Sequence, residues 1–241
     1  MISPLRMYGD GLLGGAGSGA RQQVRLIDGS AIPLELERFL SPADAIDEQL
    51  LEGLHGPVLD VGCGPGRHLH ALASAGVFAL GVDLSPVAVG LAIGGGGRAI
   101  VGDIFDELPG DGWQSALLLD GNIGIGGAPV RLLARVADLL DEAGVMLVEL
   151  GAPGTWTGAT QARLESPHST SGWFPWARVA AGAIGPVARA GGFQTTRVWS
   201  LGGRWFARLH RGRETAGRRQ LGRQSAARLS IGPSARAGSV P

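Results

Sequence analysis

The sequence VLDVGCGPGRH, residues 58–68, decides the fold of this chain. It begins with a short apolar run, continues with glycines at positions 62, 64 and 66, and leads into apolar residues at helical spacing from Leu69. This pattern predicts a buried strand, a tight turn and the start of a helix. Glycine lets a ligand approach the backbone, and a helix N-terminus presents unpaired N–H groups. We therefore expect a flat or anionic ligand on the turn.

The spacing of the glycines separates two classes of nucleotide-binding turn. Dinucleotide-binding folds use Gly-x-Gly-x-x-Gly, which would require glycine at position 67, where this chain has Arg67. The chain instead has Gly-x-Gly-x-Gly, with Asp60 two residues before the first glycine. The segment DVGCGPG resembles motif I of the class I S-adenosylmethionine-dependent methyltransferases, and the resemblance extends over residues 58–209.

This resemblance implies a fold and a cofactor. The family has an α/β fold with a Rossmann-like, doubly wound, mostly parallel seven-stranded sheet in three α/β/α layers and an antiparallel C-terminal hairpin. The implied cofactor is S-adenosyl-L-methionine. Its amino-acid part would lie on the loop of Gly62, Cys63, Gly64 and Gly66, and Asp60 would help to hold its ammonium group.

The next predicted strand, residues 77–82, ends at Asp83, 23 residues after the acid of motif I. A carboxylate at this point of a nucleoside-binding fold can accept hydrogen bonds from both ribose hydroxyls. We therefore expect Asp83, with the adjacent Leu84, to contact the cofactor. The alternative is an acid placed at the start of the following helix, which Ser85 caps.

A third predicted strand, residues 98–101, leads into Asp103 and Ile104. By resemblance to the family, Asp103 would accept a hydrogen bond from the exocyclic amine of adenine, and Ile104 would lie near the ring. The alternative for Asp103 is a turn residue that binds the local backbone, which is common after glycine.

The fourth predicted strand, residues 116–119, closes on Asp120, Gly121 and Asn122. Ligands of parallel sheets bind at the carboxyl ends of the strands, and this end should adjoin the first strand at the topological switch point. Many methyltransferases carry Asp/Asn-Pro-Pro-Tyr here, whereas residues 120–127 contain no proline and no aromatic residue. That departure argues against N-methylation of adenine or glutamine, and the alternative is a glycine-rich connector.

His68 and Asp120 are the candidate catalytic residues, because they are the titratable groups expected nearest the transferred methyl group. Either could act as a general base. We expect His68 to be neutral, since the dipole of a helix N-terminus disfavours its charge. Asp120 could instead hold the cofactor's ammonium group, both residues could have purely structural hydrogen bonds, and methyl transfer could depend on proximity alone.

The chain reads as one methyltransferase domain with two extensions. Residues 1–23 lack periodicity and are expected to be poorly ordered. The domain spans residues 24–210, with an N-terminal hairpin and helix over 24–56 and the Rossmann-like core over 57–210. Residues 211–241, rich in arginine, glycine and serine, are expected to form a disordered tail.

Several local patterns predict further elements. A helix is expected from Ser41, as its cap, to Leu54, another from Pro129 to the residue before Gly144, and a third from Pro175. Residues 151–174 read as a long loop, and tryptophans there and at position 176 could line a substrate pocket or fill the core.

Composition excludes several classes of function. The chain has 21 basic and 21 acidic residues, so no overall field favours nucleic acid or a membrane surface. It has one cysteine, no apolar run long enough to span a membrane and no signal-peptide pattern, which predicts a cytoplasmic protein. No metal site is expected.

The leading hypothesis is an enzyme that transfers a methyl group from S-adenosyl-L-methionine to an O, N or C nucleophile of a small-molecule acceptor. A second hypothesis is a cofactor-binding protein without transferase activity that acts through a partner. A third is an NAD(P)-dependent oxidoreductase, which Arg67 and the predicted C-terminal hairpin oppose. The sequence identifies neither the acceptor nor an oligomeric state.

Overall fold

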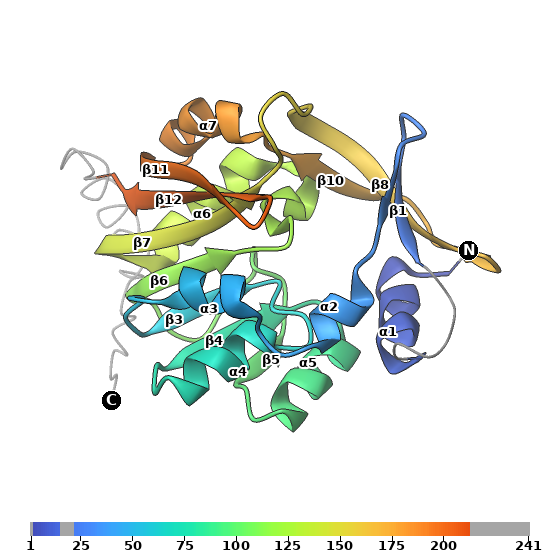
Figure 1. The fold of residues 1–241 in the computed structure, drawn as a ribbon, viewed down its shortest axis with the longest axis horizontal. Coiled ribbons are helices and arrows are strands. Elements are labelled where there is room, and N and C mark those ends of the chain that lie inside the picture. The colour runs from blue at the N-terminus through green and yellow to red at the C-terminus, as the bar shows by residue number, and fades with distance from the viewer. Residues whose placement is uncertain (1, 15–21, 213–241) are drawn as a thin grey trace, which may run out of the picture.

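A seven-stranded sheet forms the centre of the computed structural model, which describes residues 2–14 and 22–212 (Figure 1). Its strand order is β11-β12-β7-β6-β3-β4-β5. The pairs from β7 to β5 are parallel, and β12 is antiparallel to both of its neighbours. The strands are β3 (Val58–Val61), β4 (Ala79–Asp83), β5 (Ala99–Val101), β6 (Trp113–Leu118), β7 (Leu140–Leu150), β11 (Phe193–Leu201) and β12 (Arg204–Arg211). The predicted fold class, including the antiparallel C-terminal hairpin, is confirmed.

Alternation along the buried strands creates a core on each face of this sheet. In β6, Ala116 and Leu118 belong to one buried cluster, whereas Leu117 belongs to the other. The first cluster is covered by α6 (Pro129–Leu139) and α7 (Ile184–Ala190). The second is covered by α3 (Ala45–Leu51), α4 (Arg67–Ser74) and α5 (Pro86–Gly94). This is the predicted three-layer α/β/α arrangement.

A second, antiparallel sheet lies beside the carboxyl edge of the first, at the right of Figure 1. Its order is β10-β8-β1-β2, and β9 pairs with β8. The strands are β1 (Gln23–Leu26), β2 (Ala31–Pro33), β8 (Gly158–Ser166), β9 (Ser169–Thr170) and β10 (Phe174–Arg178). The predicted N-terminal hairpin is therefore present, but it pairs with residues that we expected to form a loop. The expectation of a loop over 151–174 is wrong for β8 and β9.

The helix predicted from Pro175 is also wrong at its start. Residues 174–178 form β10, at the edge of the second sheet, where a proline is tolerated because its missing N–H faces no partner. A 3-10 turn, η2 (Ala181–Ala183), precedes α7. Pro175 suits both the first turn of a helix and an edge strand, so the residue alone does not distinguish them.

Two other predicted helices have different bounds. The cap of α3 is Asp44, whose side chain accepts from the backbone N–H of Ile46 and Asp47 in a capping box, while a separate short helix, α2 (Leu36–Leu40), ends before Ser41. Helix α6 ends at Leu139, and Gly144 lies inside β7, because the chain from Leu140 pairs with β6 and β12.

The N-terminal segment is ordered where the structure describes it. Pro4–Gly14 form helix α1, so the expectation of poor order is wrong for these residues. Met7 and Leu12 are buried, and α1 packs against α5, β8 and α2. The expectation of a tail over 211–241 is wrong for Arg211, because this residue belongs to β12, and residues 213–241 lie outside the described residues. Within the described part of the chain, no helix is long and apolar enough to cross a membrane.

The packing of α1 predicts unequal effects of two neighbouring leucines. Leu12 is 3% exposed and Leu13 is 67% exposed. Leu12→Ala should lower the free energy of unfolding by about 2–4 kcal/mol, because it removes buried methyl groups and leaves a cavity. Leu13→Ala should change it by less than about 0.5 kcal/mol. Urea unfolding checks this, and equal effects of the two variants would show that α1 does not pack on the domain.

Candidate active site

The glycine loop joins β3 to α4, and its three glycines all have left-handed backbone conformations. Gly62, Gly64 and Gly66 have φ of 72°, 54° and 89°. A Cβ on Gly62 would lie 2.7 Å from Nδ2 of Asn122, and one on Gly66 would lie 2.7 Å from Cβ of Ala92. Glycine is therefore required for conformation at all three positions and for space at the first and third.

The side chain of Cys63 is packed between the loop and β4, and its Sγ donates to the carbonyl of Gly64 at 3.7 Å. It is buried, and its Sγ lies 2.5 Å from where a Cβ on Gly81 of β4 would be. Burial, with Asp60 and Asp83 nearby, raises the pKa of the thiol well above its usual range. Only the backbone of Cys63 can therefore contribute to a ligand site on the loop.

Asp83 lies at the end of β4, beside the glycine loop. Its Oδ2 accepts from the backbone N–H of Gly64 at 2.9 Å, and its Oδ1 accepts from that of Ser85 at 2.8 Å. Burial raises the pKa of this carboxyl group. The adjacent Leu84 is 45% exposed. Asp83 thus holds the loop against the start of α5, and its contact with ribose stays a prediction.

Asp103 and Ile104 follow β5 as expected, but both have partners within the protein. Oδ1 of Asp103 accepts from the backbone N–H of Phe105 at 3.0 Å, which is the turn contact of the alternative interpretation. Ile104 is buried in the first core cluster. The contacts of both residues with adenine stay predictions.

The end of β6 is joined directly to the end of β3. Nδ2 of Asn122 donates to the carbonyls of Val61 and Gly62, both at 2.9 Å. Asp120 is the single non-glycine residue with positive φ, at 55°, in the described part of the chain, and Gly121 follows at 82°. Adjacent strands β3 and β6 therefore meet at the switch point as predicted. Strain at Asp120 is a common feature of functional sites.

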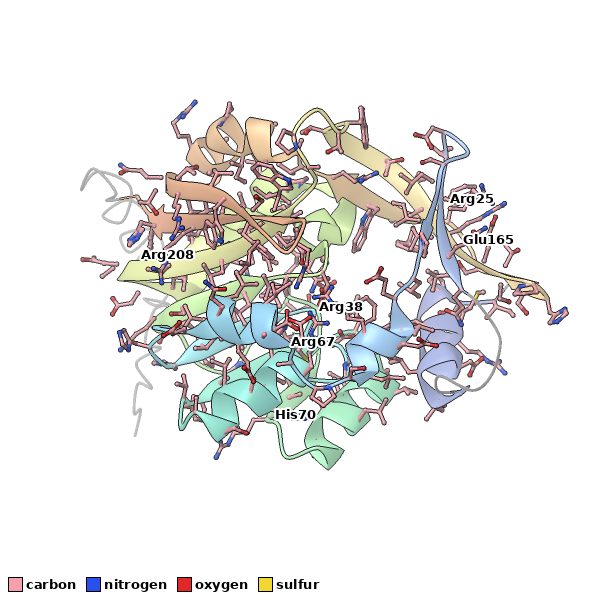
Figure 2. All side chains as sticks on the ribbon, viewed as in Figure 1. Arg25, Arg38, Arg67, His70, Glu165 and Arg208 are labelled. Atoms are coloured by element: carbon pink, nitrogen blue, oxygen red, sulfur yellow. The ribbon has the colours of Figure 1, made fainter. Side chains whose placement is uncertain are left out.

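A network of buried and partly buried ion pairs lies beside these strand ends, and the buried Arg67 is its centre. The guanidinium of Arg67 bonds to Asp47 of α3 through Nε at 2.9 Å and to Asp120 through Nη2 at 2.8 Å. Arg38 of α2 also reaches Asp47 and Asp120, at 3.3 and 3.0 Å. Figure 2 shows Arg38 and Arg67 close together near the middle of the molecule.

Arg204, the first residue of β12, extends the network to the sheet. It forms two bonds with the carboxylate of Glu149 on β7, at 2.8 and 2.6 Å, and further bonds with Asp47 at 2.9 Å and Asp120 at 3.3 Å. Oε2 of Glu149 accepts from the backbone N–H of Asp120 at 2.7 Å. The strained backbone at Asp120 is thus held from several sides.

His68 lies between two carboxylates and is 4% exposed. Its Nε2 is 3.6 Å from Asp47 and its Nδ1 is 3.8 Å from Asp60. Burial alone would lower its pKa, but the two carboxylates raise it to about 9. The expectation that His68 is neutral is therefore wrong, because the two carboxylates favour the charged ring more than burial and Arg67 disfavour it. A ring protonated at neutral pH is poorly suited to be a general base.

Asp120 is also poorly placed to take a proton. Burial would raise the pKa of its carboxyl group, but Arg67, His68 and Arg38 hold it below its usual range. Its oxygens accept from three guanidinium groups. The structure thus favours a positioning role for Asp120 over the role of a base.

Asp60 has an unsatisfied oxygen. The residue is 2% exposed, and its Oδ2 has no hydrogen-bond partner among the described residues. Its nearest cation is His68, with Nδ1 at 3.8 Å, and a donor from a ligand would give the oxygen a hydrogen bond as well. Its contact with the cofactor's ammonium group stays a prediction.

Sequence reasoning missed most of the ion-pair network. In the structure Asp47 is the third residue of α3, and nothing in the sequence signals that this capping-box residue is buried. We used Arg67 only as evidence against a dinucleotide-binding turn. An arginine directly after the last glycine of a buried turn could also have indicated a buried acidic partner. Arg38 and Arg204 come from distant segments with no local signal.

Comparison with known proteins supports the fold. The chain is similar to a SAM-dependent methyltransferase from Bacteroides fragilis solved with S-adenosyl-L-homocysteine, at 20% identity over 87% of this chain and 95% of that one, with a TM-score of 0.71. It is also similar to a 1,6-didemethyltoxoflavin-N1-methyltransferase from Burkholderia thailandensis, at 17% identity over 70% and 77% of the two chains, with a TM-score of 0.53.

A third similar structure is an amino pentose methyltransferase from Micromonospora echinaspora solved with SAM, at 19% identity over 68% of this chain and 86% of that one, with a TM-score of 0.52. No protein-family model and no curated protein sequence matches the chain. The chain therefore has the fold of the class I S-adenosylmethionine-dependent methyltransferases.

Removal of Arg67 should be far more destabilising than removal of a surface arginine. Arg67→Met leaves Asp47 and Asp120 short of a buried partner, which should cost about 3–5 kcal/mol of unfolding free energy. Arg6 forms a pair with Asp10 at 3.8 Å in which both side chains are mostly exposed. Arg6→Met should therefore cost less than about 0.5 kcal/mol. Chemical denaturation of both variants measures the difference, and similar losses would contradict a structural role for the network.

The raised pKa of His68 predicts a loss of stability at alkaline pH. A group whose pKa is higher in the folded than in the unfolded protein stabilises the fold fully below the unfolded value, near 6.5, and loses this effect as pH rises to about 9. The loss should be about 3 kcal/mol. Unfolding of the wild type should therefore depend on pH in this range more steeply than unfolding of His68→Asn. NMR titration of His68 in the wild type provides a second check, and a midpoint near 6.5 would refute the assignment.

Proposed function

We propose that this protein is an enzyme that binds S-adenosyl-L-methionine and transfers its methyl group to an O, N or C nucleophile of a small molecule. The observation that carries the proposal is the loop of three left-handed glycines held by the carboxylate of Asp83. Two proteins of similar fold, the 1,6-didemethyltoxoflavin-N1-methyltransferase and the amino pentose methyltransferase, support a small-molecule acceptor. We expect no nucleic-acid or membrane partner and a cytoplasmic location.

The residues at the loop fit the parts of this cofactor. Oδ2 of Asp60, which has no hydrogen-bond partner among the described residues, can accept from an ammonium group, and the missing side chain of Gly64 lets the amino-acid part approach the loop backbone. Asp83 can accept from ribose hydroxyls, and the exposed side chain of Leu84 gives an apolar surface beside it.

The cofactor supplies an electrophilic methyl group on a positively charged sulfur, and the protein must align an acceptor with it and keep water away. His68 and Asp120 are the titratable residues expected nearest the methyl position. Asp47 and Asp60 keep His68 charged, and the oxygens of Asp120 already accept hydrogen bonds from three arginines. We therefore propose that the rate comes from alignment, and that the acceptor atom is nucleophilic without loss of a proton to either residue.

Binding of S-adenosylhomocysteine tests the cofactor assignment. Asp83→Ala should weaken binding by about 10- to 150-fold, the equivalent of about 1.5–3 kcal/mol for hydrogen bonds to a charged group. Asp28→Ala is the matched control, because this carboxylate lies in the exposed turn between β1 and β2 and bonds only Ser30 there. Calorimetry measures both. Unchanged affinity in a folded Asp83→Ala protein would reject the ribose contact, and a wild type that does not bind would reject the proposed function.

Turnover with isotope-labelled S-adenosyl-L-methionine and a panel of small acceptors separates an enzyme from a cofactor-binding protein. Label transferred to an acceptor supports the enzyme. Tight cofactor binding with no transfer to any acceptor would favour a binding protein that acts through a partner.

A further inference from the structure

Helix α1 lies against the cofactor site, although its sequence suggested no ordered element. Gly9 allows the close packing of α1 on α5, since a Cβ there would lie 3.0 Å from Cγ2 of Val87. The side chain of Gln22, which is buried, donates to the carbonyl of Met7 at 3.0 Å and ties the helix to the start of β1. The helix is thus fixed beside α5, which begins three residues after Asp83.

Tyr8, the only tyrosine of the chain, points from α1 to the glycine loop. Its hydroxyl oxygen is 3.2 Å from the position that a Cβ on Gly64 would occupy. The side chain is partly buried, and no hydrogen bond joins the hydroxyl to another residue within 2–14 or 22–212. A phenolic hydroxyl in such a place usually has a partner, so this one is available to a ligand.

The charged groups around Tyr8 come from both ends of the expected cofactor position. Burial raises the pKa of the phenol well above its usual range, and the carboxylates of Asp83 and Asp120 raise it further, while Arg67 opposes them. The hydroxyl therefore stays protonated and can donate. Asp83 marks the predicted ribose position, whereas Asp120 and Arg67 mark the strand end beside the predicted methyl position. Tyr8 interacts electrostatically with charges at both positions.

We propose that Tyr8 is a further cofactor-binding residue, whose hydroxyl reaches across Gly64 and donates a hydrogen bond to the carboxylate of the cofactor's amino-acid part. This inference rests on the proposed function. The amino-acid part has one anionic group, and neither its ammonium group nor the sulfonium can accept a hydrogen bond. The ribose hydroxyls have Asp83 as their expected acceptor, and the acceptor nitrogens of adenine are expected beside Asp103. At Gly64 the carboxylate is therefore the acceptor that needs a donor.

Two ligands separate a contact with the amino-acid part from a contact with the nucleoside. S-adenosylhomocysteine carries the amino acid, and 5′-methylthioadenosine lacks it. Tyr8→Phe keeps the ring and removes only the donor, so it should weaken binding of S-adenosylhomocysteine by about 10-fold or more. Binding of 5′-methylthioadenosine should change by less than about twofold. Leu13→Ala, on the exposed face of the same helix, is the matched control and should affect neither ligand.

The outcomes distinguish this inference from the proposed function. A wild type that binds neither ligand would reject the proposed function itself. A wild type that binds S-adenosylhomocysteine as tightly as Tyr8→Phe would overturn the role of Tyr8 and leave the proposed function intact. Equal losses for both ligands would overturn the contact with the amino-acid part.

A spectroscopic measurement makes the test independent of the variant. Protein labelled with 3-fluorotyrosine carries fluorine at Tyr8 alone, because the chain has one tyrosine. Its fluorine resonance should shift when S-adenosylhomocysteine is added at saturation, and clearly less with 5′-methylthioadenosine. A resonance that S-adenosylhomocysteine leaves in place would overturn the inference.

Discussion

The salt bridges of Arg67 with Asp47 and Asp120 are the interaction on which the site depends. Buried charges are expensive to remove from water, and this cost is offset only when each charge has partners in good geometry. Arg67 is the first residue after the glycine loop, Asp47 belongs to α3, and Asp120 lies two residues after the end of β6. One guanidinium group thus fixes the loop, a covering helix and the end of a central strand relative to one another.

The network is electrically balanced only when His68 is charged. Its carboxylates are Asp47, Asp60, Asp120 and Glu149, and its cations are Arg38, Arg67, Arg204 and His68, which gives four of each sign. Loss of the histidine proton would leave one buried carboxylate uncompensated, which is the physical reason for its raised pKa. Because of this charge balance, neither His68 nor Asp120 is suited to accept a proton from a substrate. The same ion-pair network therefore determines both the stability of the site and the groups available for its chemistry.

Structural features that depend on a few adjacent residues could be predicted from the sequence. The glycine loop, the acid that ends β4 and the C-terminal hairpin each follow from a few adjacent residues, and the structure has all three. The second sheet could not be predicted, because Pro175 suits both a helix start and an edge strand and only the pairing of β10 with β8 decides. Helix α1 contains glycines at positions 9 and 11 that weaken its helical signal, and both are required by contacts with distant residues.

Glycine contacts of this kind show how α1 and β10 pack against the Rossmann-like core. Tyr8 approaches Gly64 on one side of the site, and on the other Trp176 of β10 packs on η1 (Asn122–Gly127), where a Cβ on Gly124 would lie 2.7 Å from Cε2 of the indole. Glycine at each point lets a large side chain reach the backbone. Methyl transfer by alignment requires a site that excludes water, and α1 and the second sheet are the elements placed to do so.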